Sequence, residues 1–294
     1  MMLREEYQSS LKMREVEEFF DLVFYRPLAF LFVKAIYATD ITPNQITVVS
    51  MILGIIAGAA FAVGTPTTLV AAAVLLIIYD VLDCSDGQLA RLKKNGTRTG
   101  RILDGVSDYV VDITVYIGIG IGFANASDDP GFWWLMLVAA GLSNAVHAII
   151  VDYYRNRFLD VVLRRVSTFE EDLQAFEAER EEMRRQGDHY FDRILIGIYV
   201  GYSRLQSRIT SGSREHSHLA EADPKKYYRL NRVIIRLWLL LGPTTQITFL
   251  VVCALLNRMD LYIYGLVIAA NLWALVLYPF QSIINHRLKN TARP

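Results

Sequence analysis

Six apolar stretches recur along the sequence, each near the length of about 20 residues that crosses the hydrocarbon core of a bilayer. They are Ile46–Val63, Thr68–Asp83 with a continuation to Arg91, Gly100–Phe123, Phe132–Tyr153, Val233–Leu256 and Leu261–Ile283. Backbone polar groups in lipid must be satisfied within the chain, so stretches of this length are expected to be helices. The composition agrees, because 53% of the 294 residues are hydrophobic. The sequence therefore predicts an all-α integral membrane protein with six transmembrane helices in a lipid bilayer.

The basic residues of the connecting segments indicate the orientation. The N-terminal region carries five Lys or Arg residues, and the link between the second and third stretches carries another five, whereas the links on the opposite side carry none or one. By the positive-inside rule, both termini and the second-to-third link face the cytosol. We expect a multi-pass protein, located in the cell membrane if the source is prokaryotic, with both ends and the acidic residues beside this link on the cytosolic side.

The segment before the first span is apolar and aromatic but carries charge. Phe19–Tyr37 includes Arg26 and Lys34, which would be costly at the middle of a bilayer. An amphipathic helix lying in the interface is therefore predicted instead of a span. Thr42-Pro43-Asn44 then predicts the start of the first transmembrane helix.

A long polar insertion separates the fourth and fifth stretches. Ser167–Gln186 is predicted to be a charged helix, and the apolar run within Tyr190–Ile209 is too short to span. His216 and His218 lie in a Ser/Gly-rich stretch and are interpreted as linker residues rather than metal ligands. The first predicted units are the cytosolic and interfacial residues 1–44 and spans one to four at 45–155, which include an acidic motif at 83–108. A cytosolic helical insertion at 156–230, spans five and six at 231–287 and a cytosolic tail at 288–294 follow.

Four carboxylates lie beside the second and third apolar stretches. Asp83 and Asp86 are three residues apart, and Asp104 and Asp108 are four apart, so each pair shares one helix face. Two antiparallel helices would bring all four together, and a divalent cation would relieve their repulsion. Oxygen ligands favour Mg²⁺, Mn²⁺ or Ca²⁺, and Mg²⁺ commonly completes its shell with substrate phosphates.

Two neighbouring residues suit a phosphorylated ligand. Gly87 has no side chain, so a ligand can approach the helix closely, and Arg91 can pair with a phosphate through two parallel hydrogen bonds. A polar helix–helix contact and an ion pathway are the alternative interpretations of such acids. The two cysteines, Cys84 and Cys253, match neither a disulfide framework nor a zinc pattern and are interpreted as packing residues.

These residues resemble the signature of the CDP-alcohol phosphotransferase family, D-x2-D-G-x2-A-R followed by eight or nine residues and G-x3-D-x3-D. Every fixed position of the signature matches, at Asp83, Asp86, Gly87, Ala90, Arg91, Gly100, Asp104 and Asp108, with eight residues between the two halves. The resemblance also extends to the six spans, the amphipathic N-terminal helix and the Thr-Pro-Asn, although the insertion departs from the compact family pattern.

The resemblance implies an enzyme that transfers a substituted phosphate from a CDP-alcohol to a hydroxyl acceptor and releases CMP in phospholipid biosynthesis. Asp83, Asp86, Asp104 and Asp108 would hold one or two Mg²⁺ or Mn²⁺ ions, and Asp108 would be the general base. The residues implied to contact the CDP group are Asn44, Thr47, Gly87, Arg91 and Thr97. Relatives often form homodimers, so a second copy is a candidate partner.

The sequence identifies the acceptor substrate less narrowly than the CDP-alcohol donor. Basic residues near the cytosolic ends of the fourth and fifth spans, Arg155, Arg157, Arg232 and Arg236, are candidates for binding a phosphorylated acceptor such as inositol phosphate or glycerol phosphate. That acceptor would imply CDP-diacylglycerol as the donor. In the competing interpretation, these arginines are only the basic residues expected at the cytosolic ends of membrane spans. Transfer from CDP-choline or CDP-ethanolamine to diacylglycerol then stays open.

Two further acids, Asp80 and Asp112, lie one helical turn deeper than the signature. They are candidates for shaping an acceptor pocket or for forming a hydrogen-bonded pair.

Two other classes of function compete with the transferase. A cation transporter would use the acidic cluster as its relay, but the apolar stretches show no sign of a discontinuous helix pair. A degenerate scaffold would bind no CDP, which the complete signature argues against. The net charge of zero gives no support for a nucleic-acid partner.

Overall fold

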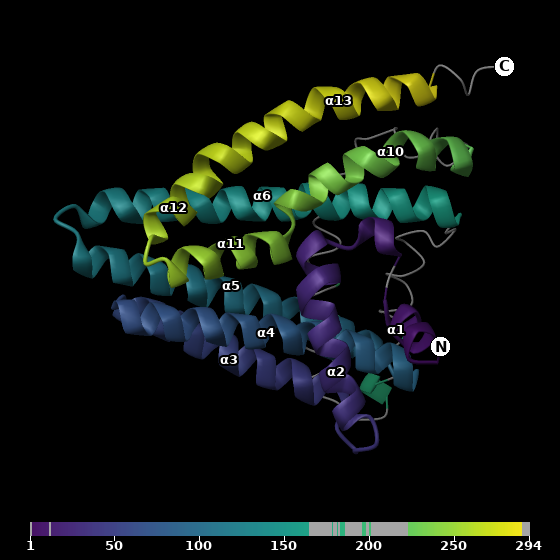
Figure 1. Cartoon of the computed structure of the whole chain (residues 1–294), viewed down its shortest axis with the longest axis horizontal. Coiled ribbons are helices and arrows are strands. Elements are labelled where there is room, and N and C mark those ends of the chain that lie inside the picture. The colour runs from purple at the N-terminus through teal and green to yellow at the C-terminus, as the bar shows by residue number, and fades with distance from the viewer. Residues whose placement is uncertain are drawn as a thin grey trace.

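The computed structural model describes residues 2–11, 13–164, 178, 181, 183–185, 196–197, 200 and 223–289. Over these residues the chain is helical and has no strands (Figure 1). The predictions for Ser167–Gln186, Tyr190–Ile209, His216 and His218 fall wholly or largely outside the described residues.

Within the described ranges, five helical segments are long and apolar enough to cross a membrane. Four are the single helices α3 (Pro43–Val63), α4 (Pro66–Lys93), α5 (Arg98–Ala126) and α6 (Pro130–Leu163). The last runs from Met259 to Leu288 through α12 (Met259–Tyr264), the π-helical η4 (Gly265–Ala270) and α13 (Asn271–Lys289). Predicted spans one to four and six are thereby confirmed as apolar helices of spanning length.

Proline at the first helical position sets where several of these helices begin. Pro43, Pro66 and Pro130 each follow a residue, Thr42, Thr65 or Asp129, whose side chain accepts a hydrogen bond from a backbone N–H of the first turn. Proline lacks the N–H that would be unpaired there, and its fixed φ suits a helix start. The predicted start at Thr42-Pro43 is confirmed.

The predicted fifth span over Val233–Leu256 is a bent pair of helices rather than one straight helix. The segment is α10 (Pro224–Trp238), the 3₁₀ turn η3 (Leu239–Leu241) and α11 (Pro243–Leu255), bent by 43° at the break. Counting this bent pair as one span gives six. The expectation that no discontinuous helix pair exists is therefore wrong.

A carboxylate from the N-terminal segment explains the break. Glu18 Oε2 accepts hydrogen bonds from the backbone N–H of Thr245 at 2.8 Å and from its hydroxyl at 2.9 Å, which caps the start of α11. A Cβ atom on Gly242 would lie 2.2 Å from Glu18 Oε1, so only glycine leaves room for this carboxylate. Pro243 then begins the new helix.

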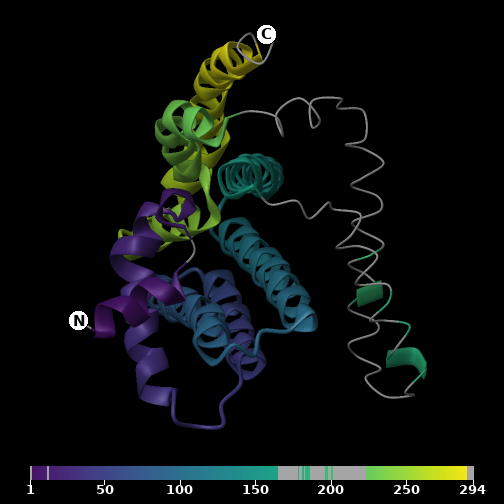
Figure 2. The same ribbon diagram turned by 90° about the vertical axis from the view of Figure 1, so that its right-hand side faces the viewer.

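Glycines allow α3 and α5 to pack with their backbones close together. A Cβ atom on Gly118 would lie 2.0 Å from the carbonyl oxygen of Gly58, and one on Gly122 would lie 2.6 Å from the carbonyl oxygen of Phe61. Small residues at such crossings are typical of membrane helices. With α4, these helices form one layer, and α6 lies between that layer and the pair α10 and α13 (Figures 1 and 2).

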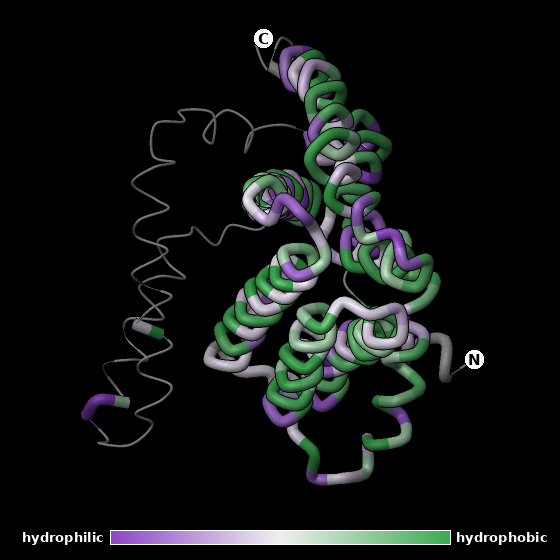
Figure 3. Tube along the Cα trace, turned by 90° about the vertical axis from the view of Figure 1, so that its left-hand side faces the viewer, coloured by the Kyte–Doolittle hydropathy of each residue, from purple (hydrophilic) through white to green (hydrophobic). Residues whose placement is uncertain are grey.

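The N-terminal segment lies across this layer. It consists of α1 (Met2–Ser10), η1 (Arg14–Val16), the π-helical η2 (Asp21–Tyr25) and α2 (Arg26–Ile36), and α2 crosses the direction of α3–α5 (Figure 1). Its outer face exposes Phe19, Val23 and Leu31. Hydrophobic residues predominate along the bundle helices as well (Figure 3). The predicted helix is present, and its place in the membrane interface stays a prediction.

Candidate active site

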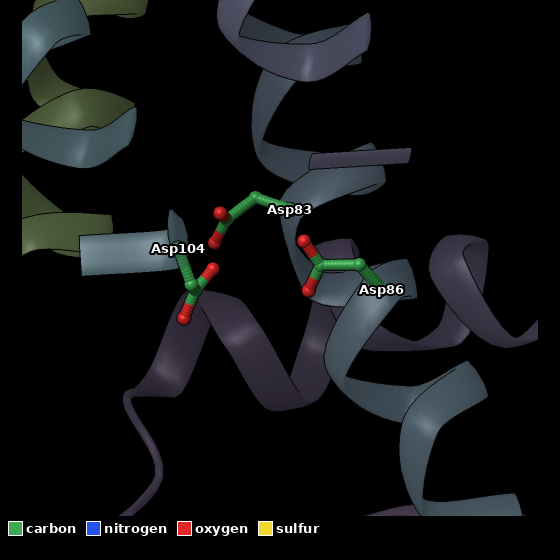
Figure 4. A group of neighbouring side chains, drawn as sticks. All are labelled: Asp83, Asp86 and Asp104. Carbon is green, nitrogen blue, oxygen red and sulfur yellow. The ribbon is translucent and has the colours of Figure 1, made fainter. Parts of the chain in front are cut away.

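Three signature carboxylates meet between α4 and α5. One oxygen from each of Asp83, Asp86 and Asp104 can be chosen so that all three lie within 4.8 Å of one another. Figure 4 shows the three side chains converging from the two helices. Asp83 and Asp86 are almost one turn apart on α4 and therefore share a helix face, and Asp104 reaches the same place from α5.

The surroundings of these carboxylates suit a divalent cation. Asp86 is buried, and its Oδ2 accepts a hydrogen bond from the Thr47 hydroxyl of α3. Asp83 Oδ1 is buried and has no hydrogen-bond partner among the residues that the structure describes. Buried carboxylates that repel one another need a compensating charge, and an all-oxygen set is the kind that Mg²⁺ or Mn²⁺ accepts. The residues present therefore fit such an ion.

Asp108 lies one helical turn beyond Asp104 on α5. Its Oδ1 accepts a hydrogen bond of 2.9 Å from the hydroxyl of Tyr79 on α4. Asp108 is also close enough to Asp83 for their charges to interact. Sequence reasoning missed Tyr79; its position four residues before Asp83, on the same helix face, was the available signal.

The residues implied for CDP binding gather at the ends of α3, α4 and α5. The Arg91 guanidinium lies beside Gly87, where a Cβ atom would meet it at 3.5 Å, and Arg91 Nε donates to the backbone oxygen of Ser10. The Asn44 side chain lies against Gly100, with its Oδ1 2.8 Å from where a Cβ would be. Thr97 caps α5 by accepting a hydrogen bond from the Gly100 N–H at 2.9 Å.

The four candidate acceptor arginines divide into two groups. Arg155 pairs with Glu18 at 3.3 Å, and Arg157 donates to the hydroxyl of Tyr153. Arg155 Nε and Arg157 Nη2 are both buried, and neither has a partner within the described ranges. Arg232 and Arg236 are exposed on α10.

The two deeper acids have different surroundings. Asp80 is buried near the charges of Asp21 and Glu18, and its Oδ2 has no partner in the described part of the chain. Asp112 lines a pocket between α4, α5, α6, α11 and α12. In the described residues no hydrogen bond joins Asp80 to Asp112. Cys84 and Cys253 are free and buried.

The signature motif, residues 83–108, lies within a region that matches a known family. The matching family model is the CDP-alcohol phosphatidyltransferase model, over residues 40–162. These residues belong to the CDP-alcohol phosphatidyltransferase family. The resemblance drawn from the signature is thereby confirmed for this domain, which includes α3, α4, α5 and nearly all of α6.

Three curated proteins are similar to part of this chain. A phosphatidylinositol phosphate synthase of Corynebacterium glutamicum is 32% identical over 135 residues, which are 46% of this chain and 57% of the relative. A bifunctional IPC transferase and DIPP synthase of Thermococcus kodakarensis is 29% identical over 43% of this chain and 27% of the relative. An archaetidylinositol phosphate synthase of Pyrococcus horikoshii is 29% identical over 30% of this chain and 46% of the relative. The chain thus spans less than two thirds of each relative's length.

Proposed function

We propose that this protein transfers the phosphatidyl group of CDP-diacylglycerol to a hydroxyl of a phosphorylated acceptor and releases CMP. The observation that carries the proposal is the complete family signature folded so that Asp83, Asp86 and Asp104 converge. Inositol phosphate is the preferred acceptor, because two of the three relatives are named phosphatidylinositol phosphate synthase and archaetidylinositol phosphate synthase. Glycerol phosphate is the second candidate.

Asp83, Asp86, Asp104 and Asp108 would hold one or two Mg²⁺ or Mn²⁺ ions. A bound divalent ion supplies charge neutralisation for the diphosphate and for the departing CMP. Thr47 holds Asp86 in place through its hydrogen bond, so the α3 helix supports this acidic group as well.

The protein side chains divide the remaining work between the two substrates. Asp108 takes the proton of the acceptor hydroxyl as that oxygen attacks the phosphorus. Gly87 leaves space on α4 for the nucleotide, and Arg91 supplies a guanidinium fork for its phosphates. Asn44 and Thr97 flank Gly100 at the same end of the bundle and would contact the cytidine part.

Arg155 and Arg157 are the better supported phosphate ligands for the acceptor. Each has a buried N–H group without a partner among the described residues, and an incoming phosphate would satisfy it. Arg232 and Arg236 are exposed, and would add long-range attraction for an anion rather than a buried contact. Asp80 and Asp112 are proposed to shape the acceptor side of the site.

The apolar helices support an integral membrane protein. We propose that both termini and the active site face the cytosol, because the basic link between α4 and α5 follows the acidic group directly. A homodimer is consistent with the family and stays a proposal.

The broken helix pair does not favour a cation transporter. In transporters of the discontinuous-helix kind, free helix ends bind the transported ion. Here Glu18 occupies the start of α11 and accepts its N–H and hydroxyl hydrogen bonds. Metal flux into liposomes without any nucleotide would nevertheless support transport over transfer.

The test is CMP release by the purified protein with CDP-diacylglycerol, Mg²⁺ and a panel of acceptors. Inositol phosphate should give the highest rate, and Asp108→Asn should abolish it. Asp128→Asn, in the loop after α5, is the matched control and should leave the rate unchanged. Undiminished turnover in Asp108→Asn would remove the assigned base. Activity only with CDP-choline or CDP-ethanolamine and diacylglycerol would replace the proposed donor.

A further inference from the structure

Tyr79 is the one side chain outside the family signature that has a direct hydrogen bond to the proposed base in the described structure. It is 3% exposed, and its hydroxyl donates to Asp108 Oδ1 at 2.9 Å. The two residues come from different helices, α4 and α5, so the bond ties the base to the helix that carries Asp83 and Asp86.

The ring of Tyr79 is held firmly behind this bond. It belongs to the main hydrophobic core, together with Leu76 and Val115. It also forms part of the wall of the pocket that contains Asp112. A tyrosine fixed by packing has little freedom to turn, so its hydroxyl stays directed at one oxygen of Asp108.

A carboxylate has two oxygens, and this contact distinguishes them. With Oδ1 accepting from Tyr79, rotation of the Asp108 carboxylate would break a buried hydrogen bond to a charged group, which is unfavourable. Oδ2 is the oxygen left to receive a proton from the acceptor. General-base catalysis depends on such placement within hydrogen-bond reach of the reacting hydroxyl.

We propose that Tyr79 is a positioning residue that orients Asp108 so that Oδ2 accepts the acceptor proton. The proposal rests on the proposed function. In the step it serves, the acceptor O–H bond breaks and its proton passes to Asp108 Oδ2. The acceptor oxygen forms the new P–O bond, and the bond from that phosphorus to CMP breaks, with CMP leaving with the electron pair.

Tyr79→Phe tests the proposal because it removes one hydroxyl and keeps the ring. We expect kcat to fall on the order of tenfold, within the range that a misplaced base causes. KM for CDP-diacylglycerol should stay within about twofold of wild type, because the hydrogen bond of the Tyr79 hydroxyl goes to Asp108 and not to any residue proposed to bind the nucleotide.

Tyr262→Phe is the matched control. Its hydroxyl lies in the same pocket and hydrogen bonds to the Tyr116 hydroxyl at 3.0 Å instead of to an acid. A loss confined to kcat of Tyr79→Phe supports the proposal. A kcat within twofold of wild type, or an equal loss in Tyr262→Phe, overturns it while the proposed function stands. Absence of CMP release by the wild-type protein overturns the proposed function itself.

Discussion

The buried carboxyl of Glu18 gives the fold a measurable pH dependence. Glu18 is 1% exposed, and burial raises the pKa of its carboxyl from 4.5 to about 7. Arg155 on α6 and the hydrogen bonds from Thr245 on α11 oppose the rise, whereas Asp21 adds to it. Glu18→Gln keeps the size and an oxygen that can accept from Thr245 but removes the titrating group.

The sign follows from the direction of the shift. The pKa is higher in the folded state than in the unfolded chain. Between pH 4.5 and about 7, the folded protein therefore holds a proton on Glu18 that the unfolded chain has lost. The stability linked to this proton is fully present below pH 4.5 and is lost as the pH rises through 7. Between about pH 5 and pH 7 the loss amounts to about 2 kcal/mol, from about 1.4 kcal/mol per pKa unit.

Thermal unfolding of the detergent-solubilised protein measures this loss. From pH 5 to pH 7 the wild-type protein should lose about 2 kcal/mol relative to Glu18→Gln, or roughly 5 °C in Tm. Glu5→Gln, at an exposed position of α1, should follow the wild type at every pH. Parallel curves for the wild type and Glu18→Gln would refute the reasoning.

Two further substitutions test the packing and the acidic group. Gly118→Ala should destabilise the protein by about 3 kcal/mol in thermal unfolding, because the new Cβ would lie 2.0 Å from the Gly58 carbonyl oxygen. Gly105→Ala is the control: a Cβ there would have no atom within 4 Å, so this substitution should be neutral or mildly stabilising. Thr47→Val removes the hydrogen bond to Asp86 and keeps nearly the same side-chain shape. Titration calorimetry should therefore show about tenfold weaker Mn²⁺ binding. Unchanged Mn²⁺ binding would exclude a supporting role for Thr47.

Much of the fold could be predicted because its causes are local in the sequence. The length of each apolar stretch fixes a spanning helix, and a residue such as Thr42 before Pro43 fixes where one begins. The spacing of Asp83 and Asp86 likewise places both on one face of α4. These features depend on neighbours within a few residues and need no knowledge of the tertiary structure.

The features that escaped prediction depend on residues far apart in the chain. The break at Gly242 is stabilised by Glu18, which the sequence places in a polar N-terminal segment with no visible link to α11. Tyr79 also looks like an ordinary core aromatic until α5 brings Asp108 to its hydroxyl. Hydropathy gives the length of a segment but not which distant side chain reaches it.

Mn²⁺ binding to the purified protein, followed by electron paramagnetic resonance, tests the central claim without requiring turnover. The wild-type protein should bind Mn²⁺, and more tightly when CMP is added. The double variant Asp83→Asn/Asp104→Asn should lose that binding while keeping its thermal stability, because it removes two of the three converging carboxylates. Equal Mn²⁺ binding by the wild type and the double variant would contradict the account.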